Sequence, residues 1–212
     1  EGHIAVHVLK LLSLAGLIRQ LLLSKEPSLA VRDGNADDVA HTAGSLDMGM
    51  LKEHFCNCGV LYPMQTFSKA KALDYSQIPF FVEATGEGVL TLENLAQSVS
   101  DTVYRLSSEQ RRYLHLASVF ACNFTNHLFA VSEEVLGNIG LPLSVMHPLI
   151  AETIDKVYTI GPVRGQTGPA VREDCNIMNA QMQLLSSNAE LQEMYKLISQ
   201  NIINYKHKNT ND

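Results

Sequence analysis

Short apolar runs separated by polar stretches fill the first half of the chain, whereas the second half repeats apolar residues at helical spacing. The elements that this pattern predicts before residue 107 are helices over 4–12 and 91–100 and strands over 60–63, 78–84 and 102–106. Thr91 is the predicted N-cap of its helix, and residues 65–77 are predicted to form a polar loop. Alternation of this kind is typical of an α/β domain.

From residue 107 onward the pattern predicts only helices. They cover residues 107–136, 144–160, 174–185 and 187–205. Ser107 with Gln110, and Ser187 with Glu190, have the spacing of capping boxes, so each pair predicts a helix start. Because no strand signal follows residue 106, we predict an α/β domain over 1–105 and an all-α domain over 106–212.

The first domain is short for a dinucleotide-binding fold. Each βα unit takes roughly 25–30 residues, so a six-stranded domain needs well over about a hundred. Either the domain is reduced, or this chain carries only part of it. We favour the second explanation and expect residues 1–105 to be an incomplete nucleotide-binding domain.

The charge and composition of the chain argue against several partners. The net charge is −6 and Lys and Arg form no cluster, so we expect no nucleic acid and no anionic membrane surface. The longest apolar stretch, residues 4–23, contains Lys10 and Arg19, so we expect no membrane span. Four cysteines lack the paired spacing of a zinc site, which favours free thiols, no metal and a cytoplasmic location.

Two polar clusters lie in apolar helical surroundings and are the candidate site residues. One contains Tyr113-Leu114-His115 with Asn123, Asn126 and His127, and the other contains Gln166-Thr167-Gly168-Pro169 followed by Arg172-Glu173-Asp174. Buried imidazole and amide groups destabilise a helix unless they find partners, so such clusters indicate either a site wall or a satisfied polar seam between helices.

Several ordered motifs resemble those of a known family. They are His41-Thr42-Ala43-Gly44-Ser45, Tyr62-Pro63-Met64-Gln65-Thr66-Phe67, Tyr113-Leu114-His115 with Asn123, and Thr167-Gly168-Pro169 followed by Arg172 and Asp174. Together they resemble bacterial Rossmann-like NADP-dependent oxidoreductases with a helical C-terminal domain of uncharacterised function, distant relatives of ketopantoate reductase and pyrroline-5-carboxylate reductase. Two positions depart from that pattern: Tyr62 replaces a frequent histidine, and Glu173 stands where glycine is frequent.

The resemblance implies a Rossmann-like domain that binds NADP, with NAD as the alternative. Gly2, His3, Ile4 and Ala5 match the end of a glycine-rich fingerprint, where free backbone N–H groups at a helix start hold pyrophosphate. A plain amphipathic helix is the alternative. His41, Thr42, Ala43 and Gly44 follow an apolar segment and would contact the ribose, the nicotinamide amide or the substrate, or else form a capped turn.

The remaining motifs provide candidate catalytic and substrate-binding residues. Histidine exchanges protons near neutral pH, so His115 is the expected proton donor, and Asn123 would position the substrate. The alternative is that both fasten helices together. Arg172 would bind a substrate carboxylate or else pair with Glu173, Asp174 or another acid. The other predicted substrate contacts are Gln65, Thr66, Thr167 and Gly168.

These residues lead to two functional hypotheses. The first is an NAD(P)-dependent oxidoreductase that acts on a small carbonyl, imine or hydroxy-acid in a cleft between the two domains. The second is a non-catalytic nucleotide-sensing or interaction protein on the same fold. The long apolar helices exceed what one small domain needs to cover, so we also expect a homodimer formed through the helical domain.

Overall fold

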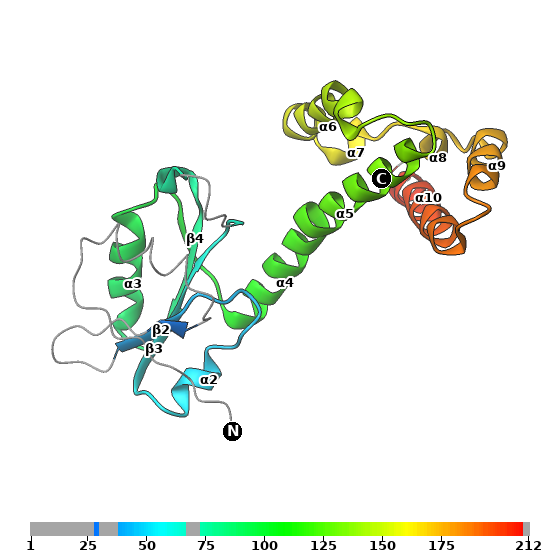
Figure 1. Ribbon diagram of the computed structural model, residues 1–212. Helices are drawn as coiled ribbons and strands as arrows, with labels where there is room; N and C mark the ends of the chain where they lie inside the picture. Colours follow the sequence, from blue (N-terminus) through cyan, green and yellow to red (C-terminus); the bar gives the residue numbers. More distant parts are fainter. Residues whose placement is uncertain (1–27, 30–37, 67–72, 210–212) are drawn as a thin grey trace. The chain divides into compact units, whose positions relative to one another are not determined.

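The computed structural model describes residues 28–29, 38–66 and 73–209, and the account below concerns these residues (Figure 1). The chain divides into two compact units, residues 1–128 and 129–212. The division lies later than the predicted domain boundary at 105/106, because the first turns of the following helix pack on the sheet. The domain boundary at 105/106 stays a prediction.

The first unit contains a mixed five-stranded sheet in the order β1-β2-β3-β4-β5. Its strands are β1 (Ser28–Leu29), β2 (Asp38–His41), β3 (Asn57–Pro63), β4 (Phe80–Ala84) and β5 (Val103–Arg105). The pairs β2–β3 and β4–β5 are parallel, whereas β1–β2 and β3–β4 are antiparallel. Three of these strands were predicted, and β3 begins earlier than expected, at Asn57.

Helix α3 (Gly88–Gln97) covers one face of the sheet (Figure 1). Its buried residues Leu92 and Ala96 pack with Leu61, Phe80 and Val82 of the central strands in the main hydrophobic cluster. The helix begins at Gly88, so the predicted cap Thr91 is wrong: it lies one turn inside. Two short elements complete the unit's connections, α2 (Gly49–Lys52) and the 3-10 turn η1 (Tyr75–Gln77).

The predicted long helix forms in three successive segments. They are α4 (Ser108–Ser118), a π-helical segment η2 (Val119–Phe124) and α5 (Thr125–Gly137). The predicted capping box at its start is confirmed, since the Gln110 N–H donates to the Ser107 hydroxyl and the Ser107 N–H donates to the Gln110 side chain. Pattern alone did not predict the π segment, because its residues remain helical.

The second unit contains helices and turns in the described residues after 128. They are the 3-10 turn η3 (Leu143–Met146), α6 (His147–Thr159), α7 (Pro162–Gly165), α8 (Pro169–Arg172), α9 (Cys175–Leu184) and α10 (Ala189–Asn209). Asp174 caps α9 through the Ile177 N–H. The predicted capping box at Ser187 is wrong: the Asn188 side chain accepts from the Leu191 N–H and caps α10 instead. None of the described helices is long and apolar enough to cross a bilayer.

Candidate functional site

The candidate site lies where the parallel strands β2 and β3 end. In an open α/β sheet, ligands bind beyond the carboxyl ends of the strands. Strand β2 ends at His41, which is in register with Val60, so Tyr62 of β3 lies two residues further along the same edge. The loop that leaves β2 contains Thr42, Ala43 and Gly44, the predicted cofactor contacts.

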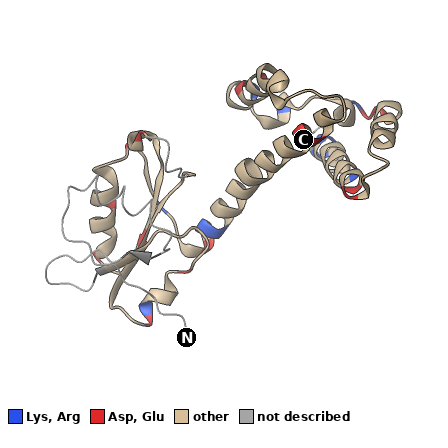
Figure 2. Ribbon diagram, in the orientation of Figure 1, with Lys and Arg blue, Asp and Glu red and all other residues tan. Residues whose placement is uncertain are grey.

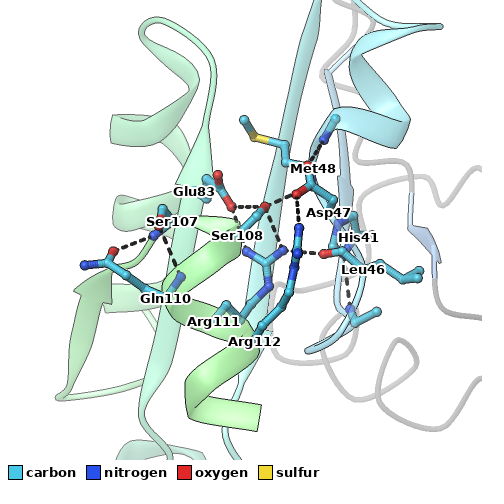
Figure 3. Close-up of polar contacts among 12 residues, drawn as sticks. His41, Leu46, Asp47, Met48, Glu83, Ser107, Ser108, Gln110, Arg111 and Arg112 are labelled. Carbon is cyan, nitrogen blue, oxygen red and sulfur yellow. Dashed lines mark hydrogen bonds and ion pairs between the residues drawn. The ribbon is translucent and has the colours of Figure 1, made fainter. Parts of the chain in front are cut away.

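A buried polar clamp holds helix α4 against this edge (Figure 3). We use this name for Glu83, Ser108 and Arg111 with the backbone of Leu46 and Met48. Arg111 is 1% exposed and donates to a Glu83 carboxylate oxygen at 2.7 Å, to the Ser108 hydroxyl at 3.1 Å and to the Leu46 carbonyl. Ser108 donates to Glu83 at 2.7 Å and accepts from the Met48 N–H at 3.0 Å. The clamp therefore ties α4 to β4 and to the segment after β2.

His115 lies one helical turn after Arg111 and meets the loop at Gly44. A Cβ atom at position 44 would lie 2.7 Å from His115 Nδ1 and 2.9 Å from Cζ of Tyr62, closer than side chains pack. Gly44 is buried, and only glycine leaves room for these two rings. The Nδ1 atom is shielded from solvent and has no hydrogen-bond partner in the described part of the chain. A shielded ring nitrogen without a partner needs an explanation, and His41 Nε2 and Arg111 Nε are without a partner in the same way.

Tyr62 completes the immediate surroundings of His115. Burial raises the pKa of the Tyr62 phenol, and the nearby Arg111 charge and a hydrogen bond with the Ser118 side chain partly offset this rise. The Ser118 hydroxyl donates to the His115 carbonyl at 2.7 Å. Sequence reasoning noted only that Tyr62 replaces a frequent histidine, but its hydroxyl lies at the site.

His41 is buried rather than open to a ligand. Its ring is 3% exposed, and its Nδ1 accepts from the Ala43 N–H at 3.2 Å. Burial and the Arg111 charge lower the pKa of His41 to about 4, so the ring is neutral near pH 7. The His41 side chain therefore shapes the loop that carries Gly44, while Thr42 and Ala43 are half-buried.

The π segment changes the angle around the helix axis between Asn123 and His115. In an unbroken α-helix, His115 and Asn123 would differ by about 80° around the axis. A π segment adds about one residue to the turn, which reduces the difference to about 20° and brings Asn123 into line with His115. Asn123 and His127 are both exposed. The expectation that His115 and Asn123 lie on one helical face is therefore consistent with the observed backbone.

The second predicted cluster lies in the second unit. Gly168 has φ 105°, a conformation that favours glycine, and it precedes Pro169 at the start of α8. Arg172 is exposed, and the acids beside it have other partners: Glu173 pairs with Lys206 and His207, and Asp174 caps α9. The alternative of an ion pair between Arg172 and Glu173 or Asp174 therefore does not form.

The predicted substrate contacts Gln65 and Thr66 lie in the described part of the chain, whereas the predicted pyrophosphate residues do not. Gln65 and Thr66 are exposed after β3, and the Gln65 side chain accepts from the Thr66 N–H at 2.8 Å. The predicted pyrophosphate residues Gly2, His3, Ile4 and Ala5 lie outside the described residues.

Sequence reasoning missed the clamp residues Glu83, Ser108 and Arg111. A signal for Glu83 was present, because this acid follows Phe80-Phe81-Val82 in an otherwise apolar strand and a buried carboxylate needs a partner. The partner could not be named from the sequence, since Arg111 and Arg112 are adjacent. The first is buried and the second forms an exposed pair with Asp47.

Comparison with known proteins agrees with this architecture, a Rossmann-like α/β sheet followed by a helical region. Residues 78–202 match the family described as Domain of unknown function (DUF2520), and the chain belongs to this family. The predicted family resemblance and fold class are confirmed. None of the curated proteins with which the chain was compared matches it.

Solved structures that are similar to this chain include two with TM-scores above 0.7. The putative NADP oxidoreductase BF3122 from Bacteroides fragilis is 40% identical, with a TM-score of 0.76, over 94% of this chain and 74% of that protein. Protein TM1727 from Thermotoga maritima is 20% identical, with a TM-score of 0.71, over 89% of this chain and 82% of that protein. The second likeness shows the shared fold alone.

Proposed function

We propose that this protein is an oxidoreductase that binds NADP, with NAD as the alternative, and acts on a small carbonyl, imine or hydroxy-acid. The Bacteroides fragilis protein, which is named for NADP, supports a nicotinamide cofactor at 40% identity. The observation that carries the proposal is the position of His115 beside Gly44, at the carboxyl ends of β2 and β3.

The described residues fit a nicotinamide at this edge. Thr42 and Ala43 have small side chains and are half-buried, so a flat ring would approach the loop beside them, whereas Gly44 is buried against His115 and Tyr62. When bound, the cofactor would supply or accept the hydride. His115 would give a proton to the new hydroxyl or amine, or take one in the reverse direction, and Asn123 would orient the carbonyl without adding charge. Gly2, His3, Ile4 and Ala5 would hold the pyrophosphate at the helix start that the sequence predicts.

We further propose that Arg172 binds a substrate carboxylate. Its guanidinium is exposed and has no ion-pair partner within the described chain, and the neighbouring acids are committed elsewhere. A free guanidinium fork suits a carboxylate in two-point contact. Thr167 and Gly168, and Gln65 and Thr66 after β3, are the further contacts proposed for a small polar substrate.

The proposal of a homodimer through the helical region rests on its exposed apolar residues. Tyr113, Leu116, Phe120 and Phe124 follow one another at spacings of three and four and are exposed by 70%, 52%, 62% and 49%. The helix from Tyr113 to Ser132 contains no Lys, Arg, Asp or Glu, and Figure 2 shows this stretch in tan after the charged residues at the start of α4. An uncharged helical stripe of this size suits contact with a second copy.

Cofactor binding tests the proposal most directly. A thermal-shift experiment on the full chain with NADPH and with NADH should show stabilisation by at least one nucleotide, about 2.7 kcal/mol at a hundred times its Kd. Turnover of small 2-oxo acids or cyclic imines should then fall in His115→Ala with binding retained. Stabilisation by neither nucleotide contradicts the proposal, and binding without any turnover favours the non-catalytic alternative.

Light scattering after size-exclusion chromatography tests the homodimer. The wild-type chain should have twice the mass of one protomer, and Phe120→Glu with Phe124→Glu should shift it to the monomer. Leu90→Glu in α3 is the matched control, since Leu90 is also 55% exposed but lies outside the stripe. A wild-type monomer at high concentration would exclude the homodimer.

A further inference from the structure

Three consecutive residues of the loop after β2 are fastened to the start of α4 (Figure 3). The Leu46 carbonyl accepts from Arg111, the Asp47 carboxylate accepts from Arg112 at 2.7 Å, and the Met48 N–H donates to the Ser108 hydroxyl at 3.0 Å. Among the described residues, these are the long-range hydrogen bonds and ion pairs of residues 42–48. The polar contacts that place this loop therefore come from α4.

The Ser108 hydroxyl joins three elements at one oxygen atom. It donates to Glu83 of β4 at 2.7 Å, and it accepts from the Met48 N–H at 3.0 Å and from Arg111 at 3.1 Å. A hydroxyl offers one hydrogen and two lone pairs, so Ser108 uses its full capacity. Ser108 is only 6% exposed, so removal of this oxygen leaves the Met48 N–H without an acceptor.

His115 and Gly44 lie in the two parts that Ser108 joins. His115 is one turn after Arg111 in α4, and Gly44 lies two residues before Leu46 in the loop. A methyl group on Gly44 would lie 2.7 Å from His115 Nδ1, so the two residues are already in close contact. Because the backbone of a helix is hydrogen-bonded from turn to turn, the placement of its first turn also places His115 relative to the loop.

We infer that Ser108 is a positioning residue of the candidate site: through Met48 and Arg111 it sets the distance between residues 42–44 and His115. The importance of this distance rests on the proposed function, in which a flat ring lies beside the loop and His115 transfers a proton. A displacement of about 1 Å between reacting groups can lower turnover by roughly a hundredfold. The distance itself can be tested without cofactor or substrate.

A double-mutant cycle tests whether Ser108 holds the loop against His115. In the wild-type background, Gly44→Ala forces a methyl group against the histidine ring and should lower the free energy of unfolding. In Ser108→Ala the loop is released and can move away, so the same methyl group should cause no more than about half of that loss. Urea unfolding of the full chain measures the four proteins of the cycle.

Ser100→Ala is the matched control. Ser100 is 4% exposed, accepts from the Thr102 N–H at 3.0 Å and donates to the Ile78 carbonyl at 2.6 Å. This variant removes an equivalent buried hydroxyl from the same unit, but just before β4 and β5 instead of at the loop. In the Ser100→Ala background, Gly44→Ala should cause the same loss as in the wild type.

A second variant covers the case in which Ser108→Ala does not fold. Ser108→Cys leaves no empty space, and its thiol is a weak donor and a weak acceptor. The loss caused by Gly44→Ala should again be smaller in this background than in the wild type.

Cofactor affinity is a measurement that a general loss of stability would not change. Where NADPH binds, Ser108→Ala should raise its Kd about tenfold, because a released loop must be ordered on binding. Ser100→Ala should leave the Kd unchanged. Fluorescence titration of the full chain with NADPH measures both variants.

The outcomes separate this inference from the proposed function. An equal loss from Gly44→Ala in the wild-type and Ser108→Ala backgrounds overturns the positioning role even if NADPH binds, and so does an equal reduction in Ser100→Ala. A reduced loss with an unchanged Kd for NADPH also overturns it, because the loop would then be placed without effect on the site. A reduction confined to the Ser108 variants supports the role even if neither nucleotide binds, a result that would count against the proposed function alone.

Discussion

The two compact units differ in where their apolar side chains lie. Among the described residues, the buried hydrophobic side chains belong to the first unit, with Ala170 as the exception. The first unit gathers Leu61, Phe80 and Val82 under a helix, whereas large side chains such as Tyr158 and Leu184 of the second unit are each 83% exposed. Helices are capped in both units.

This difference shows that a segment can form regular helices without burying an apolar face in a core. Caps and local hydrogen bonds satisfy the backbone of each helix, but most of the stability of a helix in a protein comes from burying one face. The first unit buries the apolar face of α3 within itself, although the stripe from Tyr113 to Phe124 is exposed. The second unit leaves them to contacts beyond its own described residues, which supports the proposal of a second copy.

The largest expected effect comes from opening the first unit at its buried ion pair. Arg111→Ala leaves Glu83 without its main partner, and removal of one member of a buried pair typically costs about 3–5 kcal/mol. Arg112→Ala, next in sequence, breaks an exposed pair with Asp47 and should cost at most about 1 kcal/mol. Urea unfolding of both variants measures the difference, and equal losses would contradict the clamp.

The buried His41 should make the first unit sensitive to acid. Its pKa is lowered to about 4 in the folded chain from 6.5, so the unfolded chain binds the extra proton between these values. Stability from this residue is present above pH 6.5 and is lost as the pH falls toward 4, by at most about 1.4 kcal/mol per pH unit. Unfolding measured at pH 7, 5.5 and 4 should have a smaller slope in His41→Gln; an unchanged slope would assign the acid sensitivity to other groups.

Alanine at one glycine of each unit compares tight and open packing. Gly44→Ala places a methyl group 2.7 Å from His115 and should destabilise by about 1–3 kcal/mol. Gly137→Ala, at the end of α5, meets no atom within 4 Å and should be neutral or stabilising by up to about 1 kcal/mol. Thermal melting measures both variants. Equal shifts of the two melting temperatures would contradict the packing described at the site.

The smallest expected effect concerns the cap of the last helix. Asn188→Ala removes the acceptor for the Leu191 N–H and should cost about 1 kcal/mol. Ser187→Ala is the control and should lower the free energy of unfolding by only about a few tenths of a kcal/mol. Circular dichroism during thermal unfolding measures both, and the reverse order would restore Ser187 as the cap.

Much of the architecture followed from the pattern of apolar positions. Long segments with strong helical period, such as residues 107–136, were predicted as helix, and the capping box at Ser107 and Gln110 was confirmed. A predicted helix boundary was wrong where two neighbouring residues could both serve as the N-cap. Ser187 and Asn188 are both good caps, and only the position of the first turn decides between them.

The candidate site was less accessible to sequence reasoning. His115 and Gly44 were both named, but for separate roles, since a contact between residues 71 positions apart is decided by how α4 packs on the sheet. That packing depends on Arg111 reaching Glu83, a pairing that no local spacing encodes. Tyr62 was set aside because its side chain was compared with a histidine instead of being considered for its own hydroxyl.

The π segment between Val119 and Phe124 has a consequence for how this helix can change. A wider turn holds one residue more than the α-helical path needs, so deleting any one residue there would leave the helix continuous. Every side chain beyond Phe124 would then keep its direction relative to His115, whereas the same deletion in an α-helical part of α5 would rotate the side chains after it by about 100°. The segment therefore accommodates a one-residue change in length that, elsewhere in the helix, would turn the following side chains away from the direction of the histidine.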